Sequence, residues 1–279
     1  MANLKIRSLL HHLIWLWMSL FFLVFDQKAL AVEGYYGSTW GEIFHDDDQL
    51  VGTGAMGYAN QGIDWLKLPG EILVTTYGEV RYRFRSENRP YFNAYGEALG
   101  FEFRKSSLHM GIDYLWERFP ELAAYSSGLE YYFSYYYDWD FKKMTGSKFE
   151  GLPGSVWGIL THNDDQLIGN GAMGFVNQGI DWKTFPGKIV LNTFGELRYR
   201  LRSENRPYYN AYGEALGIEL RKSSFHLGVD YLWERYPELA DYSNKVELYF
   251  TWFLDWDLKH KETTPKSEEP MINGKPFSF

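Results

Sequence analysis

The chain has 279 residues, a formal net charge of -8, 19% aromatic residues and no cysteine. This acidic balance, without any basic patch, excludes a nucleic-acid-binding protein, because such a surface would repel phosphate. The lack of cysteine excludes a disulfide scaffold and a lipid-anchored cysteine, so stability must come from hydrogen-bonded strands and packing.

The first 31 residues have the layout of a secretory signal peptide. Lys5 and Arg7 precede an apolar run from Leu13 to Phe25, and the small residues Ala29 and Ala31 follow it. The alternative, an uncleaved membrane anchor, needs about 20 apolar residues, and the run is shorter. The pattern therefore predicts export, with a mature chain from Val32 that carries 25 basic and 35 acidic side chains.

The rest of the chain is a tandem duplication. Ser38–Asp140 (the first copy) aligns without a gap to Ser155–Asp257 (the second copy) at a constant offset of 117, with about two-thirds of positions identical. The expected organisation is a signal peptide at 1–31, a first β repeat at 32–141, a connector at 142–154, a second β repeat at 155–257 and a polar tail at 258–279.

Within each copy, long segments alternate between apolar and polar residues. In Glu71–Arg85 the odd positions include Glu79, Arg81 and Arg83, whereas the even positions are mostly apolar or aromatic. Leu108–Glu117 and Leu129–Asp140 alternate in the same way, with Tyr and Trp on the apolar side. Successive strand side chains point to opposite faces, so these segments are strands with one apolar and one charged face.

The strand lengths favour a membrane-spanning sheet. Runs of 10–15 residues exceed the usual 5–6 of soluble sheets, whereas a strand tilted across a bilayer needs about 9–11. The sequence therefore predicts an all-β, antiparallel transmembrane β-barrel of roughly 10–12 strands, built from two tandem half-barrel repeats. A soluble periplasmic sandwich is the alternative, which explains the alternation but not the strand length.

One segment breaks the alternation. In Tyr91–Lys105, Glu97 has one parity, whereas Glu102 and Arg104 have the other. A β-bulge near Leu99 and Gly100 would return these charged residues to one side of the sheet, so we expect a bulge there.

The charged faces are the strongest candidate site. We expect them to line the lumen as basic ladders with acidic neighbours, which either guide an ionic or sugar solute or fill the barrel with a structural salt-bridge network. The predicted lumen-facing residues are Glu79, Arg81, Arg83, Arg85, Asp113 and Glu117, with their equivalents Glu196, Arg198, Arg200, Arg202, Asp230 and Glu234.

Two acidic turns are the most ligand-like clusters. Asp47 and Asp48 follow His45, and Asp164 and Asp165 follow His162. Carboxylates at a turn can hold a divalent cation or bridge lipopolysaccharide through one, although an acidic turn in water has the same composition. No other cofactor is expected.

A serine and a histidine recur together in the two copies. Ser107 and His109, with Ser224 and His226, invite comparison with outer-membrane serine hydrolases. Residues two apart on a strand lie about 7 Å apart, which is too far for direct activation, and no nucleophile-elbow pattern surrounds either serine. A histidine facing a wet lumen is the simpler interpretation.

Several phrases carry a family resemblance. NQGIDW (Asn60–Trp65), GELRYRLR (Gly195–Arg202), YGEALGIELR (Tyr212–Arg221) and LEYYFSYYYDWD (Leu129–Asp140) resemble the C-terminal barrel regions of bacterial outer-membrane surface proteins. Those proteins serve phage adsorption or exopolysaccharide export, and they carry helical repeats that this chain lacks. The resemblance implies an outer-membrane β-barrel.

The expected function is that of a non-enzymatic outer-membrane barrel, a small porin-like channel or envelope component linked to exopolysaccharide export. The expected partners are outer-membrane lipid or lipopolysaccharide, and a polysaccharide or small solute. The alternatives are an enzyme that modifies lipid or lipopolysaccharide and a soluble periplasmic carbohydrate-binding protein.

Overall fold

The computed structural model describes residues 32–47, 52–86, 93–141, 149–164, 169–203, 210–239 and 241–257. The predicted signal peptide at 1–31 and the polar tail at 258–279 lie outside these residues, as does most of the connector. Among the described residues, no helix has the length and apolar character needed to cross a membrane.

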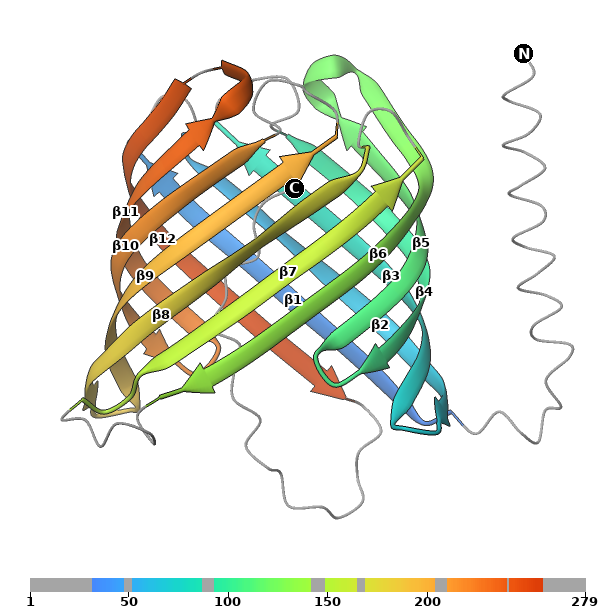
Figure 1. Ribbon diagram of the computed structural model, residues 1–279, viewed down its shortest axis with the longest axis horizontal. Helices are drawn as coiled ribbons and strands as arrows, with labels where there is room; N and C mark the ends of the chain where they lie inside the picture. Colours follow the sequence, from blue (N-terminus) through green and yellow to red (C-terminus); the bar gives the residue numbers. More distant parts are fainter. Residues whose placement is uncertain are drawn as a thin grey trace, which may run out of the picture.

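The described residues form a closed barrel of antiparallel strands (Figure 1). Each strand is hydrogen-bonded to its neighbours in chain order, and β12 pairs with β1 to close the sheet. The strands are β1 (Gly34–Asp46), β2 (Gly54–Leu68), β3 (Ile72–Arg85), β4 (Ala94–Lys105), β5 (Leu108–Phe119), β6 (Ala124–Asp140), β7 (Pro153–Asn163), β8 (Gly171–Phe185), β9 (Ile189–Arg202), β10 (Ala211–Lys222), β11 (Phe225–Tyr236) and β12 (Asp241–Asp257). The predicted antiparallel barrel is confirmed, with twelve strands, and the soluble sandwich is not the fold observed.

The two sequence copies correspond to successive halves of the barrel. The first copy forms β1–β6 (the first half) and the second forms β7–β12 (the second half). Each half also has a single-turn 3-10 helix, Pro120–Leu122 and Pro237–Leu239, between its last two strands.

The barrel has two different rims. At one rim, β1 begins and β12 ends, and tight turns such as 69–71, 106–107 and 186–188 join the strands; we call it the terminal rim. The opposite rim, the far rim, carries the connections after β1, β3, β5, β7, β9 and β11. The sequence RSENRP occurs twice, at 85–90 and 202–207, where the chain passes from β3 to β4 and from β9 to β10 at the far rim. Six residues of each connection, 87–92 and 204–209, lie outside the described part of the chain.

The predicted bulge at Leu99 and Gly100 is wrong. β4 pairs continuously with both β3 and β5 through this segment, and the register shifts instead lie between Asp64 and Leu66 in β2 and at the equivalent place in β8. Glu97 therefore faces outward, with Tyr95 and Leu99. The parity break that we attributed to a bulge is instead a charged residue placed on the outer face.

The outer face of the barrel is apolar. Leu99, Met110, Leu160 and Leu216 are each more than half exposed, although large apolar side chains in water are normally buried. Tyr125 and Tyr242 stand near the far rim, and Trp182 and Trp256 lie near the terminal rim, as in the aromatic girdles of membrane barrels.

This exterior has a direct consequence for location. A closed sheet leaves no unpaired strand edge, and an apolar band with aromatic borders is the surface that a bilayer solvates. The protein is an outer-membrane β-barrel, as the sequence predicts.

Close packing inside the barrel depends on glycines opposite aromatic rings. A Cβ atom on Gly100 would lie 2.5 Å from the Tyr77 ring, and the same contact recurs between Gly217 and Phe194. Because glycine has no side chain, each ring can lie flat over the neighbouring strand. This arrangement brings the phenol of Tyr77 to the carboxylate of Asp113.

Candidate functional site in the lumen

The twelve predicted lumen residues lie on the inner face of β3, β5, β9 and β11. Alternation places their apolar neighbours, such as Val80 and Leu197, on the exposed outer face. Contacts between distant strands identify the inner face directly, because the Tyr36 hydroxyl of β1 donates to Glu102 of β4 over 2.8 Å. Side chains of β1 and β4 therefore meet inside the barrel, which identifies the face that these residues share as the inner one.

In each half, a central arginine is held by carboxylates. Arg81 Nε lies 2.9 Å from Glu79 Oε1, and its Nη1 lies 3.9 Å from Glu130 Oε1. In the second half, Arg198 Nε lies 3.1 Å from Glu196 Oε1, and its Nη2 lies 4.0 Å from Asp230 Oδ2. These side chains are largely buried, so each charge is compensated where it is removed from water.

Toward the far rim, the inner face becomes basic. Arg83 and Arg85 end β3, and Arg200 and Arg202 end β9; we call these four residues the far-rim arginine group. β3 and β9 stand six strands apart in either direction around the barrel, so the two pairs project from opposite walls. Even so, Arg83 is within electrostatic reach of both Arg200 and Arg202. The two pairs therefore share one level of the lumen.

Carboxylates from β5 and β11 partly balance this group. Glu117 acts on Arg83, and Glu234 acts on Arg85 and Arg200. Glu247 of β12 also acts on Arg85, so four arginines against three glutamates leave a net charge of +1, while Lys245 and Asp46 nearby form their own ion pair at 2.6 Å. A positive constriction therefore lies at the far-rim end of a chain that is acidic as a whole.

Toward the terminal rim, each half contains a buried glutamate with several partners. In the first half, Glu102 accepts hydrogen bonds from Tyr36 and Tyr132, both at 2.8 Å. Its carboxylate also lies 3.4 Å from His109 Nδ1 and 3.3 Å from Arg104 Nε. The sequence grouped Glu102 and Arg104 with the charged side of the sheet but gave no indication of their partners across the lumen, so this cluster was not predicted.

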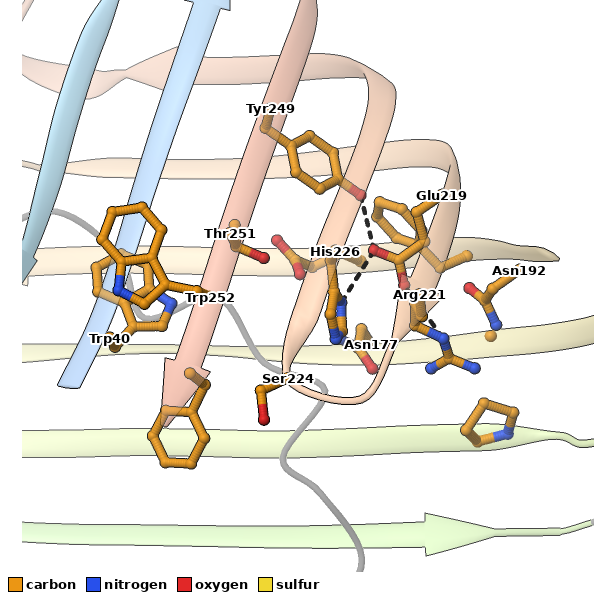
Figure 2. A pocket seen from close by; sticks show the side chains of 15 residues that line it. Trp40, Asn177, Asn192, Glu219, Arg221, Ser224, His226, Tyr249, Thr251 and Trp252 are labelled. Carbon is orange, nitrogen blue, oxygen red and sulfur yellow. Dashed lines mark hydrogen bonds and ion pairs between the residues drawn. The ribbon is translucent and has the colours of Figure 1, made fainter. Parts of the chain in front are cut away.

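The second half repeats this cluster around Glu219 (Figure 2). Tyr249 and His226 approach Glu219 from two sides, with the Tyr249 hydroxyl donating over 2.9 Å and His226 Nδ1 at 3.3 Å. Arg221 pairs with both Asp181 and Glu219. The adjoining cavity of about 30 Å³ has room for water but not for a sugar or an acyl chain.

This geometry does not support a serine–histidine catalytic pair. Ser107 and Ser224 lie in the turns before β5 and β11, whereas His109 and His226 face the lumen, each beside its buried glutamate. Each imidazole lies beside a buried carboxylate, and the structure adds no support for the enzyme alternative.

The predicted cation sites at the acidic turns fall partly outside the described residues. Asp48 and Asp165 lie there, whereas Asp47 Oδ1 accepts a hydrogen bond from Val246 N (2.9 Å) and Asp164 Oδ1 one from Leu129 N (3.1 Å). These bonds join β1 to β12 and β7 to β6 beyond the strand ends. Within the described part of the chain, no group of three or more His, Asp or Glu side chains has a geometry that could hold a metal.

No protein-family model matches the chain, and no curated protein is similar to it in sequence. Among solved structures, the β domain of the Bordetella autotransporter BrkA is 8% identical, with a TM-score of 0.37, covering 78% of this chain and 98% of its own. The KdgM porin in complex with disordered oligogalacturonate is 10% identical, with a TM-score of 0.34 and coverages of 77% and 98%. LpxR from Salmonella typhimurium is 10% identical, with a TM-score of 0.39 and coverages of 78% and 100%. At these values the matches say nothing about what this chain binds.

Proposed function

We propose that this protein is a narrow outer-membrane channel that admits small anionic solutes at its far rim. The observation that carries the proposal is the far-rim arginine group, in which arginines from opposite walls come within electrostatic reach of one another. Rings of arginine and lysine select for anions in pores, because a positive constriction in a low-dielectric wall attracts anions and repels cations.

The deeper part of the lumen is compatible with this role. The carboxylates next in line, Glu79 and Glu196, are paired with Arg81 and Arg198, so their charge is locally compensated. An anion that has passed the far-rim arginine group meets these ion pairs together with Glu130 and Asp230, the second carboxylates beside Arg81 and Arg198, so anion selectivity is set at the far rim. Small side-chain movements would open a path, since the inner wall is lined by long, flexible residues.

The sidedness of the channel follows from the chain ends. β1 begins and β12 ends at the terminal rim, and outer-membrane barrels keep their shorter turns in the periplasm. The far rim then faces outside, and the far-rim arginine group meets solutes arriving from the medium. An acidic sugar is one such solute, which is compatible with the expected link to exopolysaccharide export.

Conductance across planar bilayers tests the proposal. Purified protein should carry current, and its reversal potential in a KCl gradient should indicate preference for chloride. The double variant Arg83→Gln/Arg200→Gln removes two positive charges from the far-rim arginine group. Each arginine contributes on the order of 1 kcal/mol to a nearby anion, so the anion-to-cation permeability ratio should fall on the order of tenfold.

A matched control removes two cations elsewhere. Lys105→Gln/Lys222→Gln takes the same charge from exposed, equivalent positions at the terminal rim and should leave selectivity unchanged. Heat-modifiable mobility verifies that each variant is folded. A folded protein that carries no current, or equal selectivity in all three proteins, would contradict the channel and favour a structural role in the envelope.

A further inference from the structure

An open groove runs along the outer face of the first half, across β2 to β6, and the lumen proposal does not use it. Small or short side chains form its floor, Ala59 on β2 and Gly78 and Val80 on β3. Leu99 on β4 borders the floor, since a Cβ atom on Gly78 would lie 3.4 Å from Leu99 Cδ2. The floor is therefore a shallow apolar channel that faces the bilayer.

The second half offers a natural comparison for this groove. The positions equivalent to Ala59 and Val80 are Val176 and Leu197, which together add three carbon atoms to the wall. Both are outward-facing and exposed. The two halves thus share the surrounding outer face, but in the second half the larger side chains Val176 and Leu197 fill the floor.

Two opposite charges stand at the far-rim end of the groove. Arg118 lies one residue before the end of β5, and Glu97 pairs with Trp116, further from the rim. Both side chains are exposed on the outer face, and neither has a hydrogen bond or ion pair within the part of the chain that the structure describes. Charges on the lipid face of a barrel are tolerated near the interfaces, at a cost of about 0–1 kcal/mol.

The order of these features along the groove defines its occupant. Arg118 stands nearest the far rim, and Glu97 lies next inward, in register with Trp116 on one side and with Val80 and Ala59 of the floor on the other. Gly78 and Leu99 continue the apolar floor further inward. A phosphorylated glycolipid presents a matching order, with phosphate outermost, sugar hydroxyl or amide N–H groups below it, and acyl chains below those. A phospholipid such as phosphatidylglycerol has its hydroxyl groups outside the phosphate rather than below it, and would leave Glu97 facing hydrocarbon without a partner.

We propose that this groove binds one phosphorylated glycolipid of the outer leaflet, with its phosphate on Arg118. The Glu97 carboxylate accepts a hydrogen bond from an amide or hydroxyl of the sugar, and one acyl chain lies over Ala59, Gly78 and Val80. The site belongs to the first half alone. It does not depend on whether the lumen conducts.

Native mass spectrometry of the full chain in mild detergent tests the site. Diphosphoryl lipid A is the probe, and the control ligands are dephosphorylated lipid A and phosphatidylglycerol. The wild-type protein should retain one diphosphoryl lipid A in preference to either control. Arg118→Gln should weaken its retention about tenfold or more, because a charge-assisted hydrogen bond is lost.

Two further variants use the duplication as a control. Ala59→Val/Val80→Leu gives the first half the floor of the second and should reduce retention to a similar degree. Arg235→Gln makes the same charge change at the equivalent place in the second half and should have no effect. Heat-modifiable mobility verifies folding, since these outward positions are not part of the inner packing.

Three results would overturn the proposal. The first is an equal loss for Arg118→Gln and Arg235→Gln, which would indicate unspecific attraction. The second is retention of phosphatidylglycerol as strong as that of diphosphoryl lipid A. The third is a mass corresponding to two protein chains with no lipid, which would show that a second copy covers the groove.

Discussion

The two junctions between the halves of the barrel are built differently. Where β12 meets β1, Lys245 Nζ lies 2.6 Å from Asp46 Oδ2, and Asp46 pairs in register with Glu247. Where β6 meets β7, the residue equivalent to Lys245 is Gly128. There the residue equivalent to Asp46 is Asn163, which donates through Nδ2 to Glu130 over 3.5 Å.

This difference shows that the two copies differ by a whole buried ion pair and not by one of its charges. Asp46, Lys245 and Glu247 together carry a net charge of -1, and so do Gly128, Glu130 and Asn163. Both members of the ion pair differ between the copies, so neither junction buries half a pair. A lone buried charge would cost several kcal/mol, whereas the exchange of both partners can be almost neutral.

The location of the ion pair also has a reason. β6 and β7 are joined through the chain, whereas β12 and β1 are the last and first strands and meet only through side chains and backbone hydrogen bonds. The Asp46–Lys245 pair therefore lies at the junction that closes the barrel. Its loss should matter more than any comparable change elsewhere in the lumen.

Breaking this pair has the largest expected effect. Lys245→Met removes the ion-pair partner of the buried Asp46 carboxylate, and should lower the free energy of unfolding by about 3–5 kcal/mol. Urea unfolding of the protein in lipid vesicles, followed by tryptophan fluorescence, measures the change.

The double variant Asp46→Asn/Lys245→Met sharpens this comparison, because it gives the closing junction the uncharged partners of the other one. We expect it to recover most of the lost stability. Conversely, Asn163→Asp alone should destabilise the β6–β7 junction, and Gly128→Lys should rescue it. Additive effects of the two changes at either junction would show that the ion pair has no coupling energy.

The glutamate clusters near the terminal rim give an intermediate effect. Glu102 accepts from both Tyr36 and Tyr132, whereas Glu219 accepts from Tyr249, and the residue equivalent to Tyr36 is Pro153. Tyr36→Phe should therefore cost about 1.5–3 kcal/mol, the range for hydrogen bonds to charged groups. Tyr35→Phe, on the outer face of the same strand, is the matched control. An equal loss of stability in that variant would show that the hydrogen bond from Tyr36 to Glu102 does not account for the effect.

The smallest expected effect concerns Asp113 and Asp230. The Tyr77 hydroxyl donates to Asp113 over 2.7 Å, whereas its equivalent, Phe194, has no hydroxyl. Phe194 lies over Gly217 as Tyr77 lies over Gly100, so Phe194→Tyr should direct a hydroxyl toward Asp230 and stabilise the barrel by about 1 kcal/mol. Tyr77→Phe should have the opposite sign, and the same vesicle unfolding assay compares the two. A loss of stability in Phe194→Tyr would mean that the second half has no room for the oxygen.

Much of the fold was predictable from alternation alone. Strands such as Ile72–Arg85 and Leu108–Phe119 have apolar residues at every second position, and this period determines both the strand and the face that meets lipid. The same period predicts that Arg83 and Arg200 both face inward, because each lies an even number of positions from the other charged residues of its own strand.

The clusters were not predictable, because parity says nothing about depth or about partners across the lumen. The bulge assumed near Gly100 misplaced Glu97 on the charged side of the sheet, and parity alone gave no partners for Glu102 and Arg104. Lys245 was missed because its neighbour Asp46 belongs to a strand almost 200 residues earlier. One signal was present: the exchanges of Lys245 for Gly128 and of Asp46 for Asn163 both alter charge, and they compensate each other.

The sequence by itself therefore determined the barrel class, the duplication and the sorting of side chains to two faces, because each is a local or periodic property. The tertiary structure decided which charges meet, since closing the sheet sets the register of β12 against β1 and the distance between β3 and β9. That closure places Asp46 beside Lys245 and brings the arginines of opposite walls together. Electrostatic energy depends on those distances, and no linear pattern contains them.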